Sequence, residues 1–281
     1  MTTPRDWDAA TYDRVADPMT AWGSAVLDRL PLRGNERVLD AGCGSGRVTE
    51  LLAERLPHGS VIALDGSPTM VDHARARLDR FGDRIDYLVA DLGRPIPLAE
   101  PVDAILSTAT FHWVPDHDSL FRHLAAVLRP GGRLVAQCGG AGNIASIQRV
   151  LVTIGDGWLG PVHFETPEAT TDRLVAAGFV DVRCWLTEEP TRFEPGAPFE
   201  AYLRTVVLGA HLERLEPADR DPFVHEVASR LAEPAIDYVR LNIDARRSDE
   251  AHSPTGYRLW LSRHPGSGNM PVGHENRLEH A

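Results

Sequence analysis

The most constraining feature of this chain is a glycine-rich segment that joins an apolar run to a helical pattern. Residues 38–46 read Val-Leu-Asp-Ala-Gly-Cys-Gly-Ser-Gly, and Val48, Leu51 and Leu52 follow at helical spacing. The pattern predicts a buried strand, a tight turn and an amphipathic helix. Glycines at such a turn let the main chain approach a ligand closely, and the helix N-terminus presents free N–H groups. The segment therefore predicts a ligand-binding turn.

The spacing of these glycines argues against a dinucleotide site. Such a site needs Gly-x-Gly-x-x-Gly or Ala, because the third small residue lets the helix pack closely on the strand. Counted from Gly42 and from Gly44, that position holds Arg47 and Thr49. Both side chains are too large. An ordinary glycine turn without a ligand remains the alternative at this point.

Short apolar runs then alternate with amphipathic patterns, which is typical of an α/β fold with a largely parallel sheet. The second half adds two late strands that are separated by apolar helices, which indicates a cap over the carboxyl edge of the sheet. The expected strands cover residues 37–40, 61–65, 85–90, 102–106, 133–136, 180–186 and 239–245, and the expected cap helices cover about 199–215 and 219–231.

Composition removes several function classes. The chain has no lysine, since all 29 basic residues are arginine, and this excludes Schiff-base chemistry and a Walker A loop. A formal net charge of −11 argues against nucleic acid or an anionic membrane as a partner. Cys43, Cys138 and Cys184 are far apart and no histidines cluster, so we predict no metal. No signal peptide or membrane span is recognisable, so we expect a cytoplasmic protein.

The segment 38–46, with its Asp before Gly-x-Gly-x-Gly, resembles the first motif of the class I S-adenosylmethionine-dependent methyltransferases. The resemblance covers about residues 6–246 and is strengthened by Asp65, by residues 90–92 (Ala-Asp-Leu), by residues 107–113 (Ser-Thr-Ala-Thr-Phe-His-Trp) and by residues 128–132 (Leu-Arg-Pro-Gly-Gly). It implies an α/β, Rossmann-like seven-stranded methyltransferase sheet with a helical cap, in which strands six and seven are antiparallel. Residues 1–250 would form this domain, with N-terminal cap helices at about 6–31, inserted cap helices at about 197–232 and a flexible tail at 251–281.

The same resemblance implies where the cofactor, S-adenosylmethionine, binds. Asp65 would accept both ribose hydroxyls and Asp91 would hold the adenine amino group. Asp40 would contact the cofactor's amino group through water, or else brace the glycine loop. The full predicted cofactor set is Asp40, Gly42, Gly44, Gly46, Asp65, Gly66, Met70, Asp91, Leu92 and Thr108.

A narrower resemblance links the chain to the trans-aconitate and juvenile-hormone-acid methyltransferases, which methylate small carboxylic acids. It rests on residues 7–14, on residues 22–23 and on residues 111–117 (Phe-His-Trp-Val-Pro-Asp-His). Relatives usually carry glutamine where this chain has Met19, so a polar contact is expected to be lost. We therefore predict methyl transfer to a small molecule, chiefly O-methylation, without specifying a carboxylate.

Methyl transfer is an in-line displacement, which positioning and desolvation can largely accelerate. We expect His112 to be a general base or a structural histidine, and Tyr12 and Trp113 to enclose the sulfonium or the acceptor. We expect Trp7 to pack and His117 to cap a helix or face solvent. His163 lies in a loop, residues 158–164, that could line the pocket mouth, but a position away from the pocket is the more expected one. Arg14, Arg204 and Arg240 are candidate counter-ions for an acidic substrate, and the sequence singles out none of them.

Two alternatives stay open: the same cofactor site could cyclise the cofactor's own side chain, or the fold could be a non-catalytic binding module. The expected partner is a small molecule, with no nucleic acid and no membrane, and the chain is compatible with a monomer or a homodimer.

Overall fold

The computed structural model describes residues 6–7, 17–154 and 157–249. Within these ranges a seven-stranded sheet runs in the order β3-β2-β1-β4-β5-β9-β6, and β7 pairs with β8 in a separate ribbon. The strands are β1 (Arg37–Ala41), β2 (Ser60–Asp65), β3 (Ile85–Val89), β4 (Val102–Thr108), β5 (Leu128–Gly139), β6 (Phe179–Glu188), β7 (Thr191–Arg192), β8 (Ala235–Ile236) and β9 (Val239–Arg247).

The first five strands are parallel, and β9 is antiparallel to both of its neighbours, β5 and β6. The predicted Rossmann-like sheet is therefore confirmed, including its two late antiparallel strands. The predicted tail at 251–281 lies outside the described residues. No helix in the described ranges is long and apolar enough to span a membrane.

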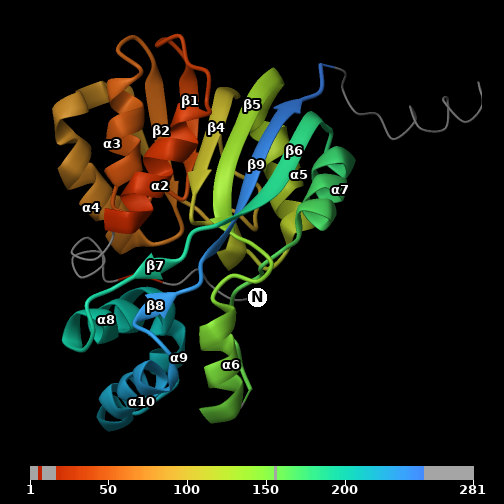
Figure 1. Ribbon diagram of the computed structural model, residues 1–281. Helices are drawn as coiled ribbons and strands as arrows, with labels where there is room; N and C mark the ends of the chain where they lie inside the picture. The colour runs from red at the N-terminus through yellow and green to blue at the C-terminus, as the bar shows by residue number, and fades with distance from the viewer. Residues whose placement is uncertain (1–5, 8–16, 155–156, 250–281) are drawn as a thin grey trace, which may run out of the picture. The chain divides into compact units, whose positions relative to one another are not determined.

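Helices cover both faces of the sheet (Figure 1). Neighbouring strand residues point to opposite faces, so Val38 packs in one core and Leu39 in the other. One core includes α2 (Asp17–Asp28), α3 (Arg47–Glu54) and α4 (Pro68–Leu78); the other includes α5 (His117–Val127) and α7 (Pro167–Ala176). Short 3-10 turns η1 (Asp79–Arg84) and η2 (Phe111–Trp113) complete this part.

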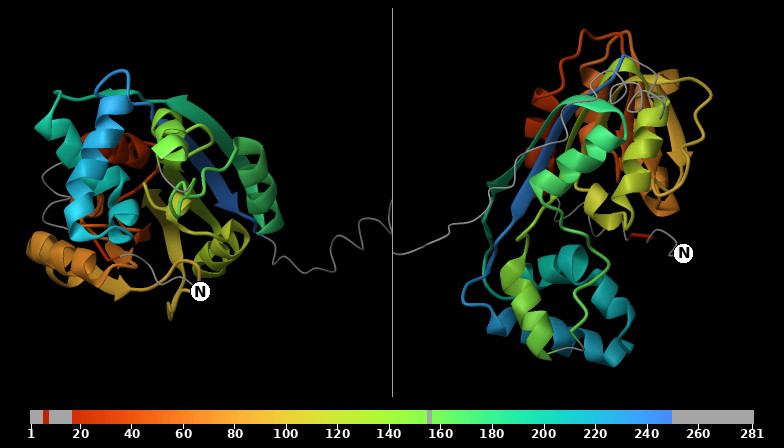
Figure 2. Two further views of the ribbon diagram at one scale, coloured as in Figure 1. Left: turned by 90° about the horizontal axis from the view of Figure 1, so that it is seen from below. Right: turned by 90° about the vertical axis from the view of Figure 1, so that its right-hand side faces the viewer.

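A third core forms a helical cap beyond the carboxyl ends of the parallel strands (Figures 1 and 2). It contains α6 (Ala145–Ile154), α8 (Ala197–Tyr202), the π-helical turn η3 (Leu203–Val207), α9 (Gly209–Glu213) and α10 (Pro217–Arg230). The sequence pattern had not indicated α6 or the β7–β8 ribbon.

The single helix predicted at 199–215 is wrong, because the chain forms three short pieces there. The Leu208 N–H donates to the Leu203 carbonyl at 2.8 Å, which closes a π-helical turn in place of an α-helical one. The spacing of apolar residues cannot distinguish a π-helical turn from an α-helical one, since both turns keep the apolar residues on one side of the helix. The turn matters for the site, because it brings Val206 and Val207 to the cavity described below.

Candidate functional site

The glycine loop after β1 has the conformation and the free space that a bound ligand requires. Gly42 has φ +93°, and a Cβ there would lie 2.0 Å from Thr110 Oγ1, so only glycine fits. Gly44 has φ +54°, and a Cβ there would meet nothing within 4 Å. Gly46 begins α3 with φ +86° but does not line the cavity. The loop thus packs tightly at its base and is open at Gly44.

Asp65, at the end of β2, holds this loop against the start of α4. One carboxylate oxygen accepts from the Gly44 N–H at 2.9 Å and the other from the Ser67 N–H at 2.9 Å. Burial raises the pKa of Asp65, while these N–H donors lower it. Ser67 caps α4, and Pro68 occupies its first turn.

A cavity of about 540 Å³ opens between the sheet edge and the cap, a size typical of small-molecule sites. It brings together most of the predicted cofactor residues, which come from four different strand ends. Those that line it are Gly42, Gly44, Asp65, Gly66, Met70, Asp91, Leu92 and Thr108.

Asp40 lies behind the loop and does not line the cavity. Its Oδ2 accepts from the Thr49 hydroxyl at 2.7 Å, which fits the bracing role, whereas its buried Oδ1 has no hydrogen-bond partner. Burial raises the pKa of the Asp40 carboxyl to about 7.

These residues fit S-adenosylmethionine. Gly44 leaves an open cradle at the loop, and Asp65 and Asp91 supply carboxylate oxygens for hydroxyl and amino donors. Among the residues that the structure describes, no group of three or more His, Cys, Asp or Glu is arranged to hold a metal ion.

His112 lies in η2, just after the end of β4, and its side chain is buried, with 8% exposed. The Gly139 N–H donates to its Nδ1 at 3.2 Å. A ring nitrogen that accepts is unprotonated, so the proton of the neutral imidazole is on Nε2. Burial, and then the charge of Arg240, hold the pKa of His112 well below its ordinary value. The ring is thus a hydrogen-bond donor at Nε2, which argues against the general base we had expected.

Arg240 lies on β9 directly opposite Gly139, is 4% exposed and lines the cavity. Its guanidinium carbon lies 4.8 Å from the ring centre of Trp22 and 5.8 Å from that of Tyr238. Its Nε donates to the Gln137 Oε1 at 3.4 Å. Of the two candidate arginines that the structure describes, Arg204 and Arg240, only Arg240 has its charge in the wall of the cavity.

Asn143 adds a third donor near His112 and Arg240. Its Oδ1 accepts from the Val239 N–H at 2.9 Å, so its amino group is turned the other way. A Cβ on Gly139 would lie 2.8 Å from Asn143 Nδ2. The amide nitrogen therefore lies beside the residue of β5 whose N–H donates to His112. Asn143 lines the cavity, and sequence reasoning missed it.

Two tryptophans cover the cavity where the N-terminal segment crosses it. Trp7 and Trp113 both line the cavity and pack edge to face, with ring centres 5.3 Å apart. Trp7 thus packs as expected and also borders the site. Asp6 anchors the segment by accepting from the hydroxyls of Ser67 and Thr69.

The remaining predicted side chains lie elsewhere. His117 is buried, and its Nε2 bonds the Phe111 carbonyl at 2.9 Å, so the expected capping or exposed role is wrong: Asp116 is the cap of α5. His163 does not line the cavity, although Pro161, Val162 and Phe164 do. Arg204 pairs with Asp221 on the cap surface. Tyr12 and Arg14 lie outside the described residues, and the side chain of Met19 is not described.

Comparison with known proteins agrees with this arrangement. Residues 38–132 match the family described as "Methyltransferase domain". A trans-aconitate 2-methyltransferase of Methylobacterium radiotolerans is 34% identical over 234 residues, which cover 78% of this chain and 86% of that protein. A second one, from Streptomyces avermitilis, is 32% identical over 241 residues, 81% of this chain and 88% of that protein. The YcgJ protein of Bacillus subtilis shares the fold, with a TM-score of 0.61 at 15% identity and coverage of 81% and 98%.

Proposed function

The chain belongs to the class I S-adenosylmethionine-dependent methyltransferases, and from that premise we propose that it methylates a carboxyl oxygen of a small organic acid. The observation that carries the proposal is the buried guanidinium of Arg240 in the cavity wall, close enough to the buried ring of His112 for its charge to lower the pKa of that ring. Arginine matches a carboxylate with two parallel N–H donors. The curated relatives are named for trans-aconitate, which is itself an acid.

Acidic residues (Asp65, Asp91 and Asp116) and residues with N–H donors (Arg94, His112, Asn143 and Arg240) both line the cavity. Asp65 and Asp91 present oxygens, as the hydroxyl and amino groups of S-adenosylmethionine require. His112, Asn143 and Arg240 present N–H donors, as an anionic acceptor requires. We propose that the hydroxyl and amino groups of the cofactor bind at Asp65 and Asp91, and that the acid binds at His112, Asn143 and Arg240.

The bound cofactor supplies an electrophilic methyl group on a positively charged sulfur. A carboxylate attacks such a carbon without losing a proton, so the reaction needs no general base, in agreement with the donor state of His112. Arg240 and His112 would hold and orient the carboxylate, so that a remaining lone pair of one of its oxygens attacks the methyl group. Trp7 and Trp113 would exclude water and keep the two reactants in line.

A two-stage experiment tests the proposal. Calorimetric titration with S-adenosylmethionine comes first, followed by incubation with a panel of mono-, di- and tricarboxylic acids, including trans-aconitate, and neutral phenols and amines. We expect methyl esters and S-adenosylhomocysteine by mass spectrometry with acids only. Methylation of neutral acceptors alone would overturn the acid assignment, methylthioadenosine would indicate cyclisation of the cofactor, and absence of cofactor binding would indicate a binding module.

Arg240→Gln should then lower kcat/KM for the acid about 30- to 150-fold, the scale of a lost charged hydrogen bond of about 2–3 kcal/mol, with the cofactor affinity unchanged. Arg204→Gln is the matched control, because it removes the same charge from the cap surface. Equal effects of the two variants would show that only net charge matters.

A further inference from the structure

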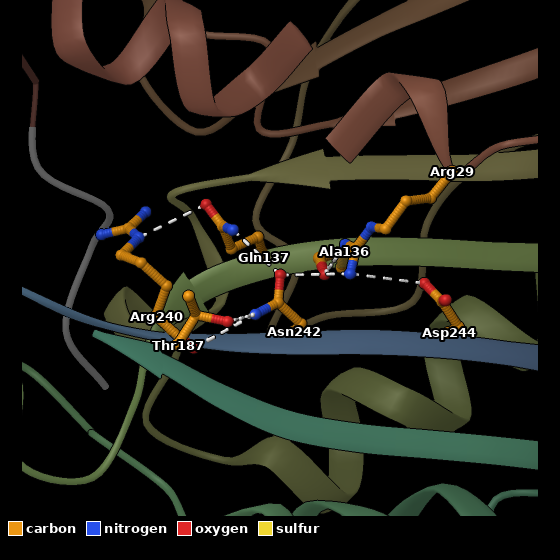
Figure 3. Close-up of polar contacts among 7 residues, drawn as sticks. All are labelled: Arg29, Ala136, Gln137, Thr187, Arg240, Asn242 and Asp244. Atoms are coloured by element: carbon orange, nitrogen blue, oxygen red, sulfur yellow. Dashed lines mark hydrogen bonds and ion pairs between the residues drawn. The ribbon is translucent and has the colours of Figure 1, made fainter. Parts of the chain in front are cut away.

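Two amide side chains lie buried side by side in the sheet, next to Arg240 in the cavity wall (Figure 3). Gln137 on β5 and Asn242 on β9 are direct register partners, and both are less than a tenth exposed. Gln137 Nε2 donates to Asn242 Oδ1 at 2.9 Å. Buried polar groups destabilise a fold unless they are hydrogen-bonded, so a pair in this position calls for a reason beyond packing.

The hydrogen bonds of the Asn242 side chain all require the same orientation of its amide group. Its Oδ1 also accepts from Arg29 Nη1 at 3.1 Å, and its Nδ2 donates to Thr187 Oγ1 at 3.1 Å and to the Arg240 carbonyl at 3.3 Å. Arginine can only donate, so Arg29 makes the oxygen of Asn242 face it. A flipped Asn242 would set an amino group against two donors.

That orientation is transmitted to Gln137. Because Asn242 presents its oxygen, Gln137 must present its amino group, and its Oε1 is left facing Arg240. Arg240 Nε donates to this oxygen at 3.4 Å. The polar chain thus runs from Arg29 through two amides to the guanidinium in the cavity wall, and each member determines the direction of the next (Figure 3).

Arg29 itself is firmly held at the far end. It comes from the turn after α2, and its Nη2 donates to the Ala136 carbonyl at 2.9 Å. Its Nη1 lies 3.6 Å from Asp244, and its guanidinium carbon lies 4.9 Å from the ring centre of Trp185. An anchored donor at this end fixes the polarity of the whole chain.

We propose that Arg29, Asn242 and Gln137 are positioning residues that orient the guanidinium of Arg240 toward the acid. The inference rests on the proposed function. Holding Nε fixes the plane of the guanidinium, and with it the direction of the two Nη groups that would meet a carboxylate. Arginine otherwise loses considerable rotamer freedom when it binds, so an arginine oriented beforehand binds more tightly.

Arg29→Met and Asp244→Asn test this as a matched pair. Both break the ion pair between these two residues, but only the first removes the donor to Asn242. With trans-aconitate, or a better acid from the panel, Arg29→Met should raise KM three- to tenfold with kcat within twofold and cofactor affinity unchanged. Asp244→Asn should leave KM unchanged, and Arg29→Lys, which keeps a donor, should restore part of the loss. Equal KM values in Arg29→Met and Asp244→Asn would overturn the proposal.

A second measurement needs no substrate and separates this inference from the proposed function. The Arg240 Nε–H signal can be assigned by ¹⁵N NMR through its loss in Arg240→Gln. Its hydrogen exchange should be at least tenfold faster in Gln137→Leu and in Arg29→Met than in the parent, and unchanged in Asp244→Asn. If no acid is methylated but this pattern appears, the proposed function fails and the relay stands. Unchanged exchange in Gln137→Leu and Arg29→Met would overturn the relay, whatever the substrate.

Discussion

The main-chain N–H of Gly139 donates to Nδ1 of His112 at 3.2 Å, and this one bond decides what the histidine can do. With Nδ1 occupied as an acceptor, the neutral ring carries its proton on Nε2 and has no lone pair to offer a substrate. Gly139 can make the contact because it has no side chain: a Cβ there would lie 2.6 Å from Phe164.

We therefore expect His112→Gln to retain more activity than His112→Phe. Glutamine offers an N–H donor near the same place, whereas phenylalanine offers none, and the difference in kcat/KM should be about tenfold, one neutral hydrogen bond. The pH profile of kcat/KM should show no loss at pH 5.5–6.5 through His112, because its pKa lies well below its ordinary value. Equal inactivity of both variants, with a rise in rate through a histidine pKa, would restore the general base.

Gly44→Ala and Gly82→Ala separate ligand binding from backbone strain. The two glycines have nearly the same φ, +54° and +55°, and neither would bring a Cβ within 4 Å of another group. An alanine at either positive φ is strained, so both variants should lose unfolding free energy, by about 1 kcal/mol or more. Gly82 also has ψ −136°, outside the left-handed helical region, so the two losses need not be equal. Only Gly44 lines the cavity, so only Gly44→Ala should weaken S-adenosylmethionine binding, by tenfold or more in calorimetry. Similar cofactor affinities in the two variants would mean that the cofactor does not touch this loop.

Asp65→Asn should weaken cofactor binding by about 1.5–3 kcal/mol, the loss expected for charge-assisted hydrogen bonds. The asparagine also has one acceptor oxygen for the two N–H groups of Gly44 and Ser67 that the carboxylate now satisfies. Titration with S-adenosylhomocysteine would measure the change. Ser67→Ala, which removes the α4 cap but leaves Asp65 in place, serves as the control for a loosened helix start. An unchanged affinity in Asp65→Asn would exclude this residue from the ribose site.

Asp40 should make the ligand-free protein less stable as pH rises toward neutrality. Its folded-state pKa is about 7 against 3.8 for the free residue, so between these values the folded state binds a proton that the unfolded state has released. This contribution is present in full below pH 3.8 and is lost as pH rises through about 7. At ~1.4 kcal/mol per unit, the loss amounts to roughly 4 kcal/mol.

Urea unfolding from pH 4 to pH 8 would measure this contribution. In Asp40→Asn the contribution should disappear, so the variant should gain stability over the parent as pH rises. Thr49→Val should raise the pH at which half of this contribution is lost, because the Thr49 hydroxyl lowers the pKa of Asp40. A constant difference between parent and Asp40→Asn across the range would show that Asp40 does not titrate there.

Local patterns predicted the sheet, and together with the family resemblance they predicted the set of cofactor residues. The apolar runs of β1 and β2, the glycine loop and the cap at Ser67 each depend on neighbours within a few residues, and parallel strands bring their carboxyl ends together wherever the strands form. That is why Gly44, Asp65 and Asp91, which lie far apart in the chain, could be placed at one edge before the fold was known.

The burial and contacts of Arg240 were decided only by tertiary structure. β9 alternates apolar and polar residues, which indicates one exposed face, yet Arg240 and Asn242 are buried because α2 and the cap cover that face. The proposed role of Arg240 depends on Gln137, 103 residues away in the chain. The tautomer of His112 depends on the main-chain N–H of Gly139 in β5. Periodicity reports which residues share a face but not what packs against that face. The sequence therefore determined which residues gather at the carboxyl edge of the parallel strands, and the assembled fold decided which buried charge lies in the cavity wall beside them.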